Sequence, residues 1–486
     1  MLHIYEEAAR CLLCKDAPCT KACSNGDPAR AIRAIRFYNT KNVWRWIKDC
    51  SDADLERAEQ ACIHYDQPIR IRELLKNEAL EPANPQISES AHQDTSLAIT
   101  FCGIPCENPF FLASSAICTN YEMVARAFDA GWAGVFYKTI CKQEIREVSP
   151  RFDAVKEGSS FIGFRNMEQL SENPYEVDFD ILHRLKKDYP KKVVIASIMG
   201  QSEEDWIELA KMAEDAGCDA VELNYSCPQM RESGMGSDVG QDPELVTFFT
   251  AYVKRNVKIP VIPKMTPNIA HISQPAMGAY FAGADAISAI NTIKSVTLGE
   301  GSEVSGCQTG SGYSGKAIKP IALRHILAMV KNPIMKNIEY SGIGGIENWK
   351  DALEFIQLGC RNVQICTAVM QYGYRIIDDL ILGLQTYMAE RGIEHVEDLV
   401  GELLPKFFLP SNLDRDTIVF PNIDYKRCIG CGRCYISCQD GGHQAIAFNE
   451  ETRQPRIIGT KCVGCHLCRL VCPSSAIGLT KRIKKK

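Results

Sequence analysis

The sequence lacks any apolar run long enough to cross a membrane, and it carries little excess charge. A transmembrane helix needs about 18 or more consecutive apolar residues, and no such run occurs. The opening MLHIYEEAAR has acidic residues and no apolar centre, which argues against a secretory signal. The formal net charge is −5, so no basic surface for nucleic acid is expected. We expect a cytoplasmic protein that binds neither membrane nor nucleic acid, with a solvated basic end, KRIKKK (481–486).

Cysteine, in contrast, is abundant, with 23 residues in the chain. Disulfides do not persist in a reducing compartment, so clustered cysteines indicate metal ligands. Four cysteines lie within residues 11–23 and eight within residues 428–472. The scattered remainder, such as Cys102, Cys118, Cys218 and Cys360, are expected to be small buried apolar side chains.

The C-terminal cysteines form two repeats, CIGCGRCYISC (428–438) and CVGCHLCRLVCP (462–473). Both have the C-x2-C-x2-C-x3-C spacing of two-cluster bacterial ferredoxins, in which the fourth cysteine of each repeat binds the other cluster. Zinc is the alternative, and this duplicated spacing makes it remote. We therefore predict two [4Fe–4S] clusters, one bound by Cys428, Cys431, Cys434 and Cys472 and the other by Cys438, Cys462, Cys465 and Cys468.

The N-terminal cysteines, CLLCKDAPCTKAC (11–23), have a different spacing, C-x2-C-x4-C-x3-C. Only Cys50 and Cys62 follow before a polar segment begins near residue 81. Six thiols suffice for one cluster and leave a second two ligands short. The spacing alone does not separate one cluster from two, nor does it exclude zinc.

Between these cysteine regions, short apolar runs alternate with amphipathic helical segments. Near-continuous apolar strands imply burial on both faces and therefore a parallel sheet. Eight strand–helix units in roughly 300 residues fit a (β/α)8 TIM barrel better than a doubly wound sheet, and no GxGxxG opens the first unit. The predicted strands are FFLAS, GVFYKT, VVIASIM, AVELNYS, PVIPKMT, AISAINT, IEYSGIG and NVQICTA.

These patterns divide the chain into a large barrel with smaller attachments. Residues 1–80 are predicted to form a small helical, cysteine-rich, iron–sulfur-like module, and residues 81–96 a linker rich in Pro, Ser, Asn and Glu. The barrel spans residues 97–400, and SLAITFCGIPCENP at its start is expected to form a hairpin that closes the bottom. A connector, 401–422, leads to the ferredoxin-like α+β domain, 423–486.

Polar side chains gather where the predicted barrel strands finish, which is where the active sites of such barrels lie. Two of them are lysines, Lys138 and Lys264. A lysine at the end of a buried strand is costly unless it meets an anion or an acceptor-rich ligand. Either lysine alone could be a surface residue at a strand tip. Two lysines within one ring of amides and hydroxyls indicate a ligand site.

Two glycine-rich segments, SGYSG (311–315) and SGIGGI (341–346), suggest a phosphate in that ligand. Glycine lets backbone N–H groups approach a phosphate closely, and SGIGGI follows the seventh predicted strand, where barrel phosphate sites are frequent. Flavin mononucleotide (FMN) fits the whole ring, with its phosphate at the glycines and a lysine beside the part of the flavin that becomes anionic on reduction.

Cys227 lies at the lip of the fourth strand, in NYSCPQM. The usual fate of a free cysteine is that of a small buried apolar residue. Here the thiol follows Asn-Tyr-Ser and precedes PQMRESGMGSDVGQ, a glycine-rich loop suited to opening and closing over a site. We favour a catalytic thiol that transfers a proton beside the flavin.

Several stretches resemble the catalytic subunits of bacterial NAD-dependent dihydropyrimidine dehydrogenases. The resemblance covers roughly residues 97–480 and rests on SPRFD, FIGFRNMEQ, NYSCPQM…GMGSDVGQ, KMTPNI, INTIKS, SGYSGKAIKPIALR, SGIGGIE and MQYGYRI. The barrel also resembles that of dihydroorotate dehydrogenases, more loosely. The resemblance implies FMN-dependent interconversion of uracil or thymine and 5,6-dihydropyrimidines. It also implies electron exchange through the clusters with a partner subunit that binds FAD and NAD(H), and we expect an oligomer.

The resemblance also implies roles for individual residues. Cys227 would be the acid that serves C5 of the pyrimidine, while flavin N5 exchanges hydride with C6. FMN would be held by Ala113, Ser114, Lys138, Lys264, Gly315, Gly344, Gly345, Ile346, Cys366 and Thr367. The pyrimidine would be held by Asn166, Glu168, Asn224, Ser226, Asn291 and Thr292.

The N-terminal module is similar to the iron–sulfur opening of the long single-chain form of this enzyme. That similarity implies one further [4Fe–4S] cluster bound by Cys11, Cys14, Cys19 and Cys62. Cys23 and Cys50 are left for a second cluster whose other ligands are not identified. The short bacterial catalytic subunits begin near residue 97 of this sequence, so the module departs from that pattern.

Two other functions remain open from the sequence. One is a dihydroorotate dehydrogenase that passes electrons through iron–sulfur centres, which would need a cation near the pyrimidine for the substrate carboxylate. The other is a non-catalytic electron-transfer component whose barrel is a docking scaffold.

Overall fold

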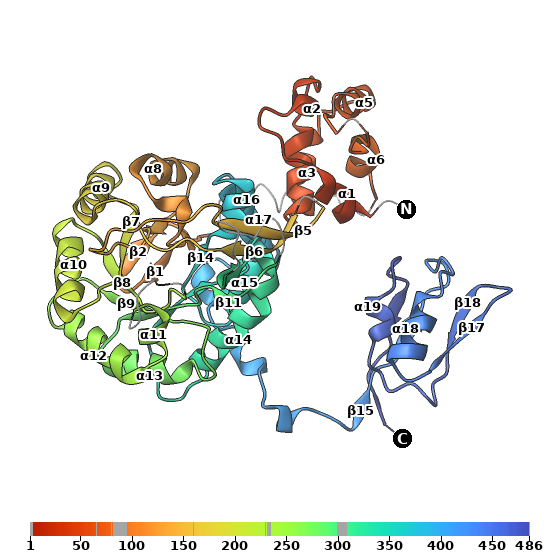
Figure 1. Ribbon diagram of the computed structural model, residues 1–486. Helices are drawn as coiled ribbons and strands as arrows, with labels where there is room; N and C mark the ends of the chain where they lie inside the picture. Colours follow the sequence, from red (N-terminus) through yellow and green to blue (C-terminus); the bar gives the residue numbers. More distant parts are fainter. Residues whose placement is uncertain are drawn as a thin grey trace. The chain divides into compact units, whose positions relative to one another are not determined.

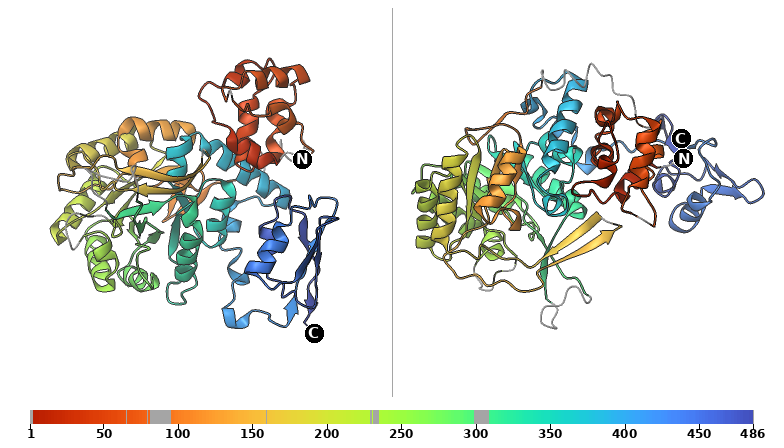
Figure 2. Two further views of the ribbon diagram at one scale, coloured as in Figure 1. Left: turned by 45° about the vertical axis from the view of Figure 1, so that its right-hand side comes forward. Right: turned by 90° about the horizontal axis from the view of Figure 1, so that it is seen from above.

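The computed structural model describes residues 3–64, 66–78, 80, 95–158, 160–228, 230, 235–298 and 309–485. The chain divides into two compact units, 1–404 and 405–486, and each is described by itself (Figures 1 and 2). Most of the predicted linker lies outside the described residues, as do residues 229 and 231–234 of the predicted lid. No helix in the described ranges is long and apolar enough to cross a membrane.

A closed barrel of eight parallel strands forms the centre of the first unit, which confirms the predicted fold class (Figure 1). Each of the eight predicted apolar runs forms one strand, and consecutive strands pair in parallel until the last closes on the first. Every residue of the strands is buried except Glu339, which is half-buried. The strands are β3 (Phe110–Leu112), β4 (Gly134–Phe136), β7 (Val193–Ile198), β8 (Ala220–Asn224), β9 (Val261–Lys264), β10 (Ala286–Ala289), β13 (Glu339–Ile343) and β14 (Asn362–Ile365).

Helices follow each strand and cover the outside of the barrel, and local sequence signals set their ends. Ser202 and Asp205 form a reciprocal capping box, while Asp242 caps a helix that has Pro243 in its first turn. The outer helices are α8 (Tyr121–Ala130), α9 (Tyr175–Asp188), α10 (Glu203–Asp215), α12 (Pro243–Lys254), α13 (Ser273–Phe281), α14 (Lys319–Val330), α15 (Trp349–Gln357) and α17 (Ile376–Arg391). Two shorter helices, α11 (Ser237–Gly240) and α16 (Thr367–Tyr372), lie in the strand-to-helix connections.

Two additions flank the barrel strands. The predicted hairpin is present as β1 (Ile99–Phe101) and β2 (Ile104–Cys106), which pair antiparallel. The second addition is a four-stranded sheet that the sequence patterns did not predict. It joins β5 (Phe152–Glu157) and β6 (Ser160–Asn166), which follow β4, to β11 (Ile293–Ser295) and β12 (Ser311–Ser314), which follow β10. The predicted SGYSG loop is therefore mostly strand β12.

The N-terminal module is helical, as predicted, and contacts the barrel through α3 and the turn after it. Arg33 makes an ion pair with buried Asp379 (Nε to Oδ2 2.8 Å). Asn39 donates to the carbonyl oxygen of Asp379 (2.9 Å), and Asn42 donates to the hydroxyl of Thr386 (3.0 Å). The helices are α1 (Ile4–Arg10), α2 (Pro18–Lys21), α3 (Pro28–Arg36), α4 (Trp44–Ile47), α5 (Asp52–Gln60) and α6 (Ile71–Leu75).

The second unit is a small α+β domain built from two similar halves. Its helices are α18 (Arg433–Gly441) and α19 (Leu467–Leu470). Three antiparallel pairs complete it: β15 (Thr417–Ile418) with β20 (Ile483–Lys484), β16 (Pro421–Ile423) with β19 (Ile477–Leu479), and β17 (Ile446–Asn449) with β18 (Gln454–Ile457).

Candidate active site and cysteine centres

A cavity of about 730 Å³, measured out to its open mouth, lies at the carboxyl ends of the barrel strands. All the residues predicted to hold FMN line it except Lys138, and so do Asn166, Asn291 and Thr292 of the predicted pyrimidine set. The patterns did not single out several other lining residues, namely Ser115, Phe164, Ile290, Ser314, Lys316, Ile318, Glu347, Gln364 and Met370.

Glycines form one end of the cavity. Gly344 and Gly345 have positive φ angles of +129° and +73°. A Cβ at Gly345 would lie 2.7 Å from the backbone nitrogen of Lys319 and 3.0 Å from the carbonyl oxygen of Gly315. No side chain fits there, so this position needs glycine for the loop to pack against Lys319 and Gly315. Lys316 lines the same cavity and supplies a positive charge suited to a phosphate.

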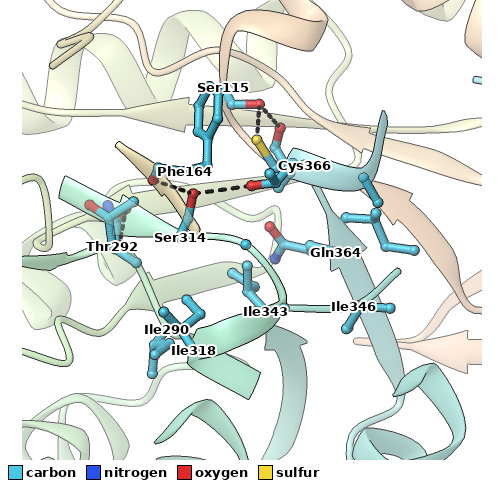
Figure 3. A pocket seen from close by; sticks show the side chains of 18 of the residues that line it. Ser115, Phe164, Ile290, Thr292, Ser314, Ile318, Ile343, Ile346, Gln364 and Cys366 are labelled. Atoms are coloured by element: carbon cyan, nitrogen blue, oxygen red, sulfur yellow. Dashed lines mark hydrogen bonds between the residues drawn. The ribbon is translucent and has the colours of Figure 1, made fainter. Parts of the chain in front are cut away.

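Hydroxyl and thiol groups line the wall beside these glycines (Figure 3). Ser314 at the end of β12 hydrogen-bonds to Thr367 (3.1 Å), and Cys366 donates to Ser115 (3.1 Å). The amide nitrogen of Gln364 donates to Ser341 (2.9 Å). Its oxygen is buried and finds no partner among the described residues. An unpaired acceptor costs free energy, so this wall fits a ligand that donates a hydrogen bond.

Glu347 also lines the cavity and directly follows Ile346. Burial raises the pKa of its carboxyl group to about 7, and nearby Lys316 opposes that shift. Its Oε1 finds no partner in the described part of the chain. A carboxyl group that stays partly protonated near neutral pH can lie close to an anion without full charge repulsion.

Lys264, at the end of β9, lines the cavity and is 3% exposed. Its Nζ lies 3.4 Å from Oε1 of Glu222, which is on β8 and fully buried. The sequence patterns missed Glu222, although a charged residue inside the apolar run AVELNYS was an available signal.

The other predicted lysine, Lys138, does not line the cavity. Its Nζ lies 3.2 Å from Oε2 of Glu168, and Arg151 lies 3.5 Å from the other carboxylate oxygen. Both Lys138 and Glu168 are less than a tenth exposed. The structure therefore places Glu168 outside the cavity wall, as the partner of two cations.

The predicted amide residues form one hydrogen-bonded series. Asn291 donates to the hydroxyl of Ser226 (2.9 Å), and Ser226 donates to the side-chain oxygen of Asn224 (2.8 Å). The amide nitrogen of Asn224 then donates to Thr139 (2.9 Å). Asn224 and Ser226 lie behind Asn291, which reaches the cavity. The structure therefore brings these predicted residues together, and they are not equally accessible.

Cys227 follows this series and is 6% exposed. Its carbonyl oxygen accepts a hydrogen bond from the backbone nitrogen of Ser237, the first residue of α11 (2.9 Å). A Cβ at Gly236 would lie 2.4 Å from the same carbonyl oxygen. The described end of the predicted lid thus packs directly on Cys227, and the residue does not line the cavity in this arrangement.

The C-terminal cysteines gather as the repeats predicted. Cys438, Cys462, Cys465 and Cys468 line one cavity. Cys434 lies among Cys428, Cys431 and Cys472, close enough for their charges to raise its pKa after burial has done so. Helix α18 thus supplies one cysteine to each set of four.

In the N-terminal module, the four cysteines that the resemblance assigns to one cluster line one cavity: Cys11, Cys14, Cys19 and Cys62. Burial and then the neighbouring Cys11 raise the pKa of Cys19 to about 11. Cys23 lies outside this cavity, with its sulfur 3.4 Å from that of Cys50. Among the described residues, no three Cys, His, Asp or Glu side chains converge on a point that suits a single ion. Four thiols around a cavity suit either a [4Fe–4S] cluster or zinc.

Comparison with known proteins identifies the family to which the chain belongs. Residues 96–388 match the family described as dihydroorotate dehydrogenase, and residues 421–479 match the 4Fe-4S dicluster domain. The NAD-dependent dihydropyrimidine dehydrogenase subunit PreA of Escherichia coli K12 is 51% identical over 390 residues, covering 79% of this chain and 95% of that protein.

Two further relatives are a dihydropyrimidine dehydrogenase and a dihydroorotate dehydrogenase subunit. The chloroplastic dihydropyrimidine dehydrogenase (NADP(+)) of Arabidopsis thaliana is 38% identical, covering 68% of this chain and 82% of the relative. The catalytic subunit of dihydroorotate dehydrogenase B (NAD(+)) from Thermoplasma volcanium is 35% identical, covering 63% and 98%. The chain therefore belongs to the dihydroorotate dehydrogenase family and, within it, is an oxidoreductase of the dihydropyrimidine dehydrogenase type.

Proposed function

We propose that the chain interconverts uracil or thymine and their 5,6-dihydro forms at a bound FMN. Electrons would pass through [4Fe–4S] clusters to or from a partner subunit that binds FAD and NAD(H). The observation that carries this proposal is the series Asn291–Ser226–Asn224, which reaches the cavity at the strand ends and leads directly to Cys227. We place this activity in a reducing compartment such as the cytoplasm, because the proposed ligands are thiolates.

The residues around the cavity fit FMN. The glycine end, with Lys316, suits the phosphate, and Lys264 with the unpartnered oxygen of Gln364 suits the polar edge of the ring. When bound, FMN supplies hydride exchange with the pyrimidine and electron exchange with the clusters. We propose that it is held by Ala113, Ser114, Lys264, Gly315, Gly344, Gly345, Ile346, Cys366 and Thr367, with Lys138 behind the wall.

The amide group suits a neutral pyrimidine. Asn side chains offer both a donor and an acceptor, as the alternating N–H and C=O edge of uracil requires. The two predicted lysines each already face a buried carboxylate, Lys264 facing Glu222 and Lys138 facing Glu168. Each of these positive charges is thus balanced by a carboxylate of the chain itself, which suits a neutral dihydropyrimidine better than the anionic dihydroorotate. We propose that Asn166, Asn291 and Thr292 touch the pyrimidine, while Asn224 and Ser226 orient Asn291 and Glu168 holds Lys138.

Cys227 would serve as the proton donor or acceptor for C5 of the pyrimidine. In the described arrangement Ser237 contacts its backbone carbonyl and the residue does not line the cavity, so the thiol would have to shift to reach a bound pyrimidine. Closure of the predicted lid would then exclude water from the reacting atoms, as catalytic lids do. The amide series holds the backbone at Ser226 and so fixes the point from which the thiol is presented.

Three clusters are proposed for the electron path. The C-terminal unit would hold two, in the sets Cys428, Cys431, Cys434 and Cys472, and Cys438, Cys462, Cys465 and Cys468. The N-terminal module would hold one, bound by Cys11, Cys14, Cys19 and Cys62. Cys23 is not proposed as a ligand of that cluster, because its sulfur contacts Cys50 instead.

The test is anaerobic bleaching of the flavin by dihydrouracil, which needs no partner subunit. In Cys227→Ala the bleaching rate should fall by about 10²–10⁴-fold, the usual contribution of a positioned acid or base, while FMN remains bound. Cys218→Ala is the matched control, since Cys218 is a buried thiol just before the same strand β8, and it should bleach normally.

Two results would contradict the proposal. An undiminished rate in Cys227→Ala would remove the thiol from the mechanism. Faster bleaching of the wild-type protein by dihydroorotate than by dihydrouracil would favour the dihydroorotate dehydrogenase reaction instead.

A further inference from the structure

Glu222 is a fully buried carboxylate inside the barrel, and it is not part of the cavity wall. Three side chains from three different strands surround it. Ser288 on β10 donates to Oε2 (2.7 Å), while Ser197 on β7 (2.9 Å) and Lys264 on β9 (3.4 Å) donate to Oε1. The carboxylate therefore links four consecutive barrel strands just beneath the cavity.

The hydrogen bonds continue from Glu222 to the cavity wall in both directions. On one side Lys264 itself lines the cavity. On the other side Ser197 bonds to Thr139 (3.0 Å), and Thr139 bonds to Ser114 (3.0 Å), which lines the cavity. Because every contact comes from a strand or its end, the position of Glu222 is fixed by the barrel frame.

Burial makes this carboxylate important for Lys264. The lysine is 3% exposed, and a buried ammonium without a counter-charge loses its proton or destabilises the fold. We propose that Glu222 is a positioning residue that keeps Lys264 charged and aimed at the cavity before the flavin is reduced. This inference rests on the proposed FMN site and concerns a residue that does not itself touch the cofactor.

The charge state of Lys264 in the oxidised protein determines how many protons are taken up when the flavin is reduced. If Lys264 is charged throughout, two-electron reduction of FMN to its anionic reduced form takes up one proton. If Lys264 is neutral in the oxidised protein, it takes up a second proton when the ring beside it becomes anionic. Each proton coupled to two electrons changes the midpoint potential by about 30 mV per pH unit.

Other titratable groups also act on this part of the cavity and are common to all variants. Lys264 interacts electrostatically with Cys118 and Cys366, and Cys366 also senses Lys138 and Glu168. Burial raises the pKa of both thiols, that of Cys118 to about 12, so they stay neutral over the range of the experiment. Lys138 and Glu168 compensate each other at 3.2 Å.

The experiment is spectroelectrochemical titration of the flavin in the intact protein between pH 6.5 and pH 8.5. Because Glu347, with a pKa of about 7, also titrates in this range, slopes are compared between variants. The potential of Glu222→Gln should fall by about 30 mV per pH unit more steeply than that of the wild type. Asp219→Asn is the matched control. It removes a carboxylate that pairs with Lys186 (2.8 Å) just before the same strand, and it should keep the wild-type slope.

An unchanged slope in Glu222→Gln with FMN bound would overturn the inference, because Lys264 would then stay charged without Glu222. Absence of FMN from the wild-type protein would instead overturn the proposed function. If Glu222→Gln folds poorly, thermal melting gives a second measurement. The double variant Glu222→Gln/Lys264→Met loses both charges. Its loss of unfolding free energy should then be smaller than the sum of the losses in the two single variants. Simple additivity would contradict the pairing.

Discussion

The two cysteine-rich regions differ in what supports their cysteines. In the C-terminal unit the cysteines are part of the core itself: Cys434, Cys438 and Cys468 are buried together with Ile423, Ala445, Ile446 and Ile477, and the partly buried Tyr435 and Ile457 pack against them. A core this small does not hold a domain of such size together by apolar burial alone. Metal binding would therefore supply much of the folding free energy of this unit.

The N-terminal module has an apolar core that does not depend on its cysteines. Ile32, Ile35, Leu55 and Leu74 are all buried between its helices and belong to the same cluster as the barrel core. Ion pairs and hydrogen bonds to α17 add to this packing. From this difference we expect the C-terminal sites to form together with the proposed clusters, and the N-terminal pocket to form whether or not a cluster is bound.

The largest expected effect is therefore loss of the C-terminal fold. Cys434→Ser with Cys438→Ser removes one ligand from each set, and both ligands lie on α18. We expect loss of about eight irons together with rapid proteolysis of residues 405–486. Iron analysis and limited proteolysis measure the two effects. A unit that stays resistant to protease without its iron would contradict the comparison.

A smaller effect is expected in the N-terminal module. Cys62→Ser should remove about four irons while α3 and α5 stay folded, because their packing does not depend on the cluster. Cys23→Ser is the matched control and should leave the iron content unchanged, since Cys23 contacts Cys50 and not the cavity. Iron loss in Cys23→Ser equal to that in Cys62→Ser would show that both cysteines bind a cluster.

The smallest effect concerns the contact between the module and the barrel. Burial raises the pKa of Asp379 to about 6, although Arg33 opposes the shift. The folded protein thus holds a proton that the unfolded chain releases near pH 4, so stability is lost as the pH rises toward and through 6. In the wild type, the free energy of local unfolding of α3 should therefore fall by about 1 kcal/mol between pH 5 and pH 7.5. This fall should be absent in Asp379→Asn.

Hydrogen exchange of the α3 amides measures this difference. Glu390→Gln is the control, because Glu390 lies on the same helix and pairs with Lys41, not with Asp379 or its partners, and its removal should leave the pH dependence of the wild type. Equal pH dependence in Asp379→Asn and the wild type would show that Asp379 does not titrate in this range.

The barrel was predictable because each strand is a near-continuous apolar run with a polar residue at its end. The four-stranded sheet was not, because β12 is only Ser311–Ser314 and its partner β6 lies far away along the chain. Its fit depends on contacts that a local pattern does not reveal: a Cβ at Gly163 would overlap the Tyr313 hydroxyl at 1.5 Å.

The candidate site, like the fold, was only partly predictable from the sequence. Strand ends identified the ligand wall, because the topology of a parallel barrel brings them together. They did not identify which acid each lysine would meet, since Glu222 and Glu168 reach Lys264 and Lys138 from other strands. The exposure of Cys227 was also beyond the sequence, because it depends on how α11 settles over the loop.

The shared sheet over the cavity restricts how this enzyme could change its substrate. Asn166 ends β6, and Asn291 and Thr292 come just before β11, so these residues are carried by two insertions that pair through β12. Replacing either insertion alone would break the backbone ladder that holds the other. A new specificity would therefore have to arise through matched changes in both segments, and laboratory evolution of one loop at a time should stall.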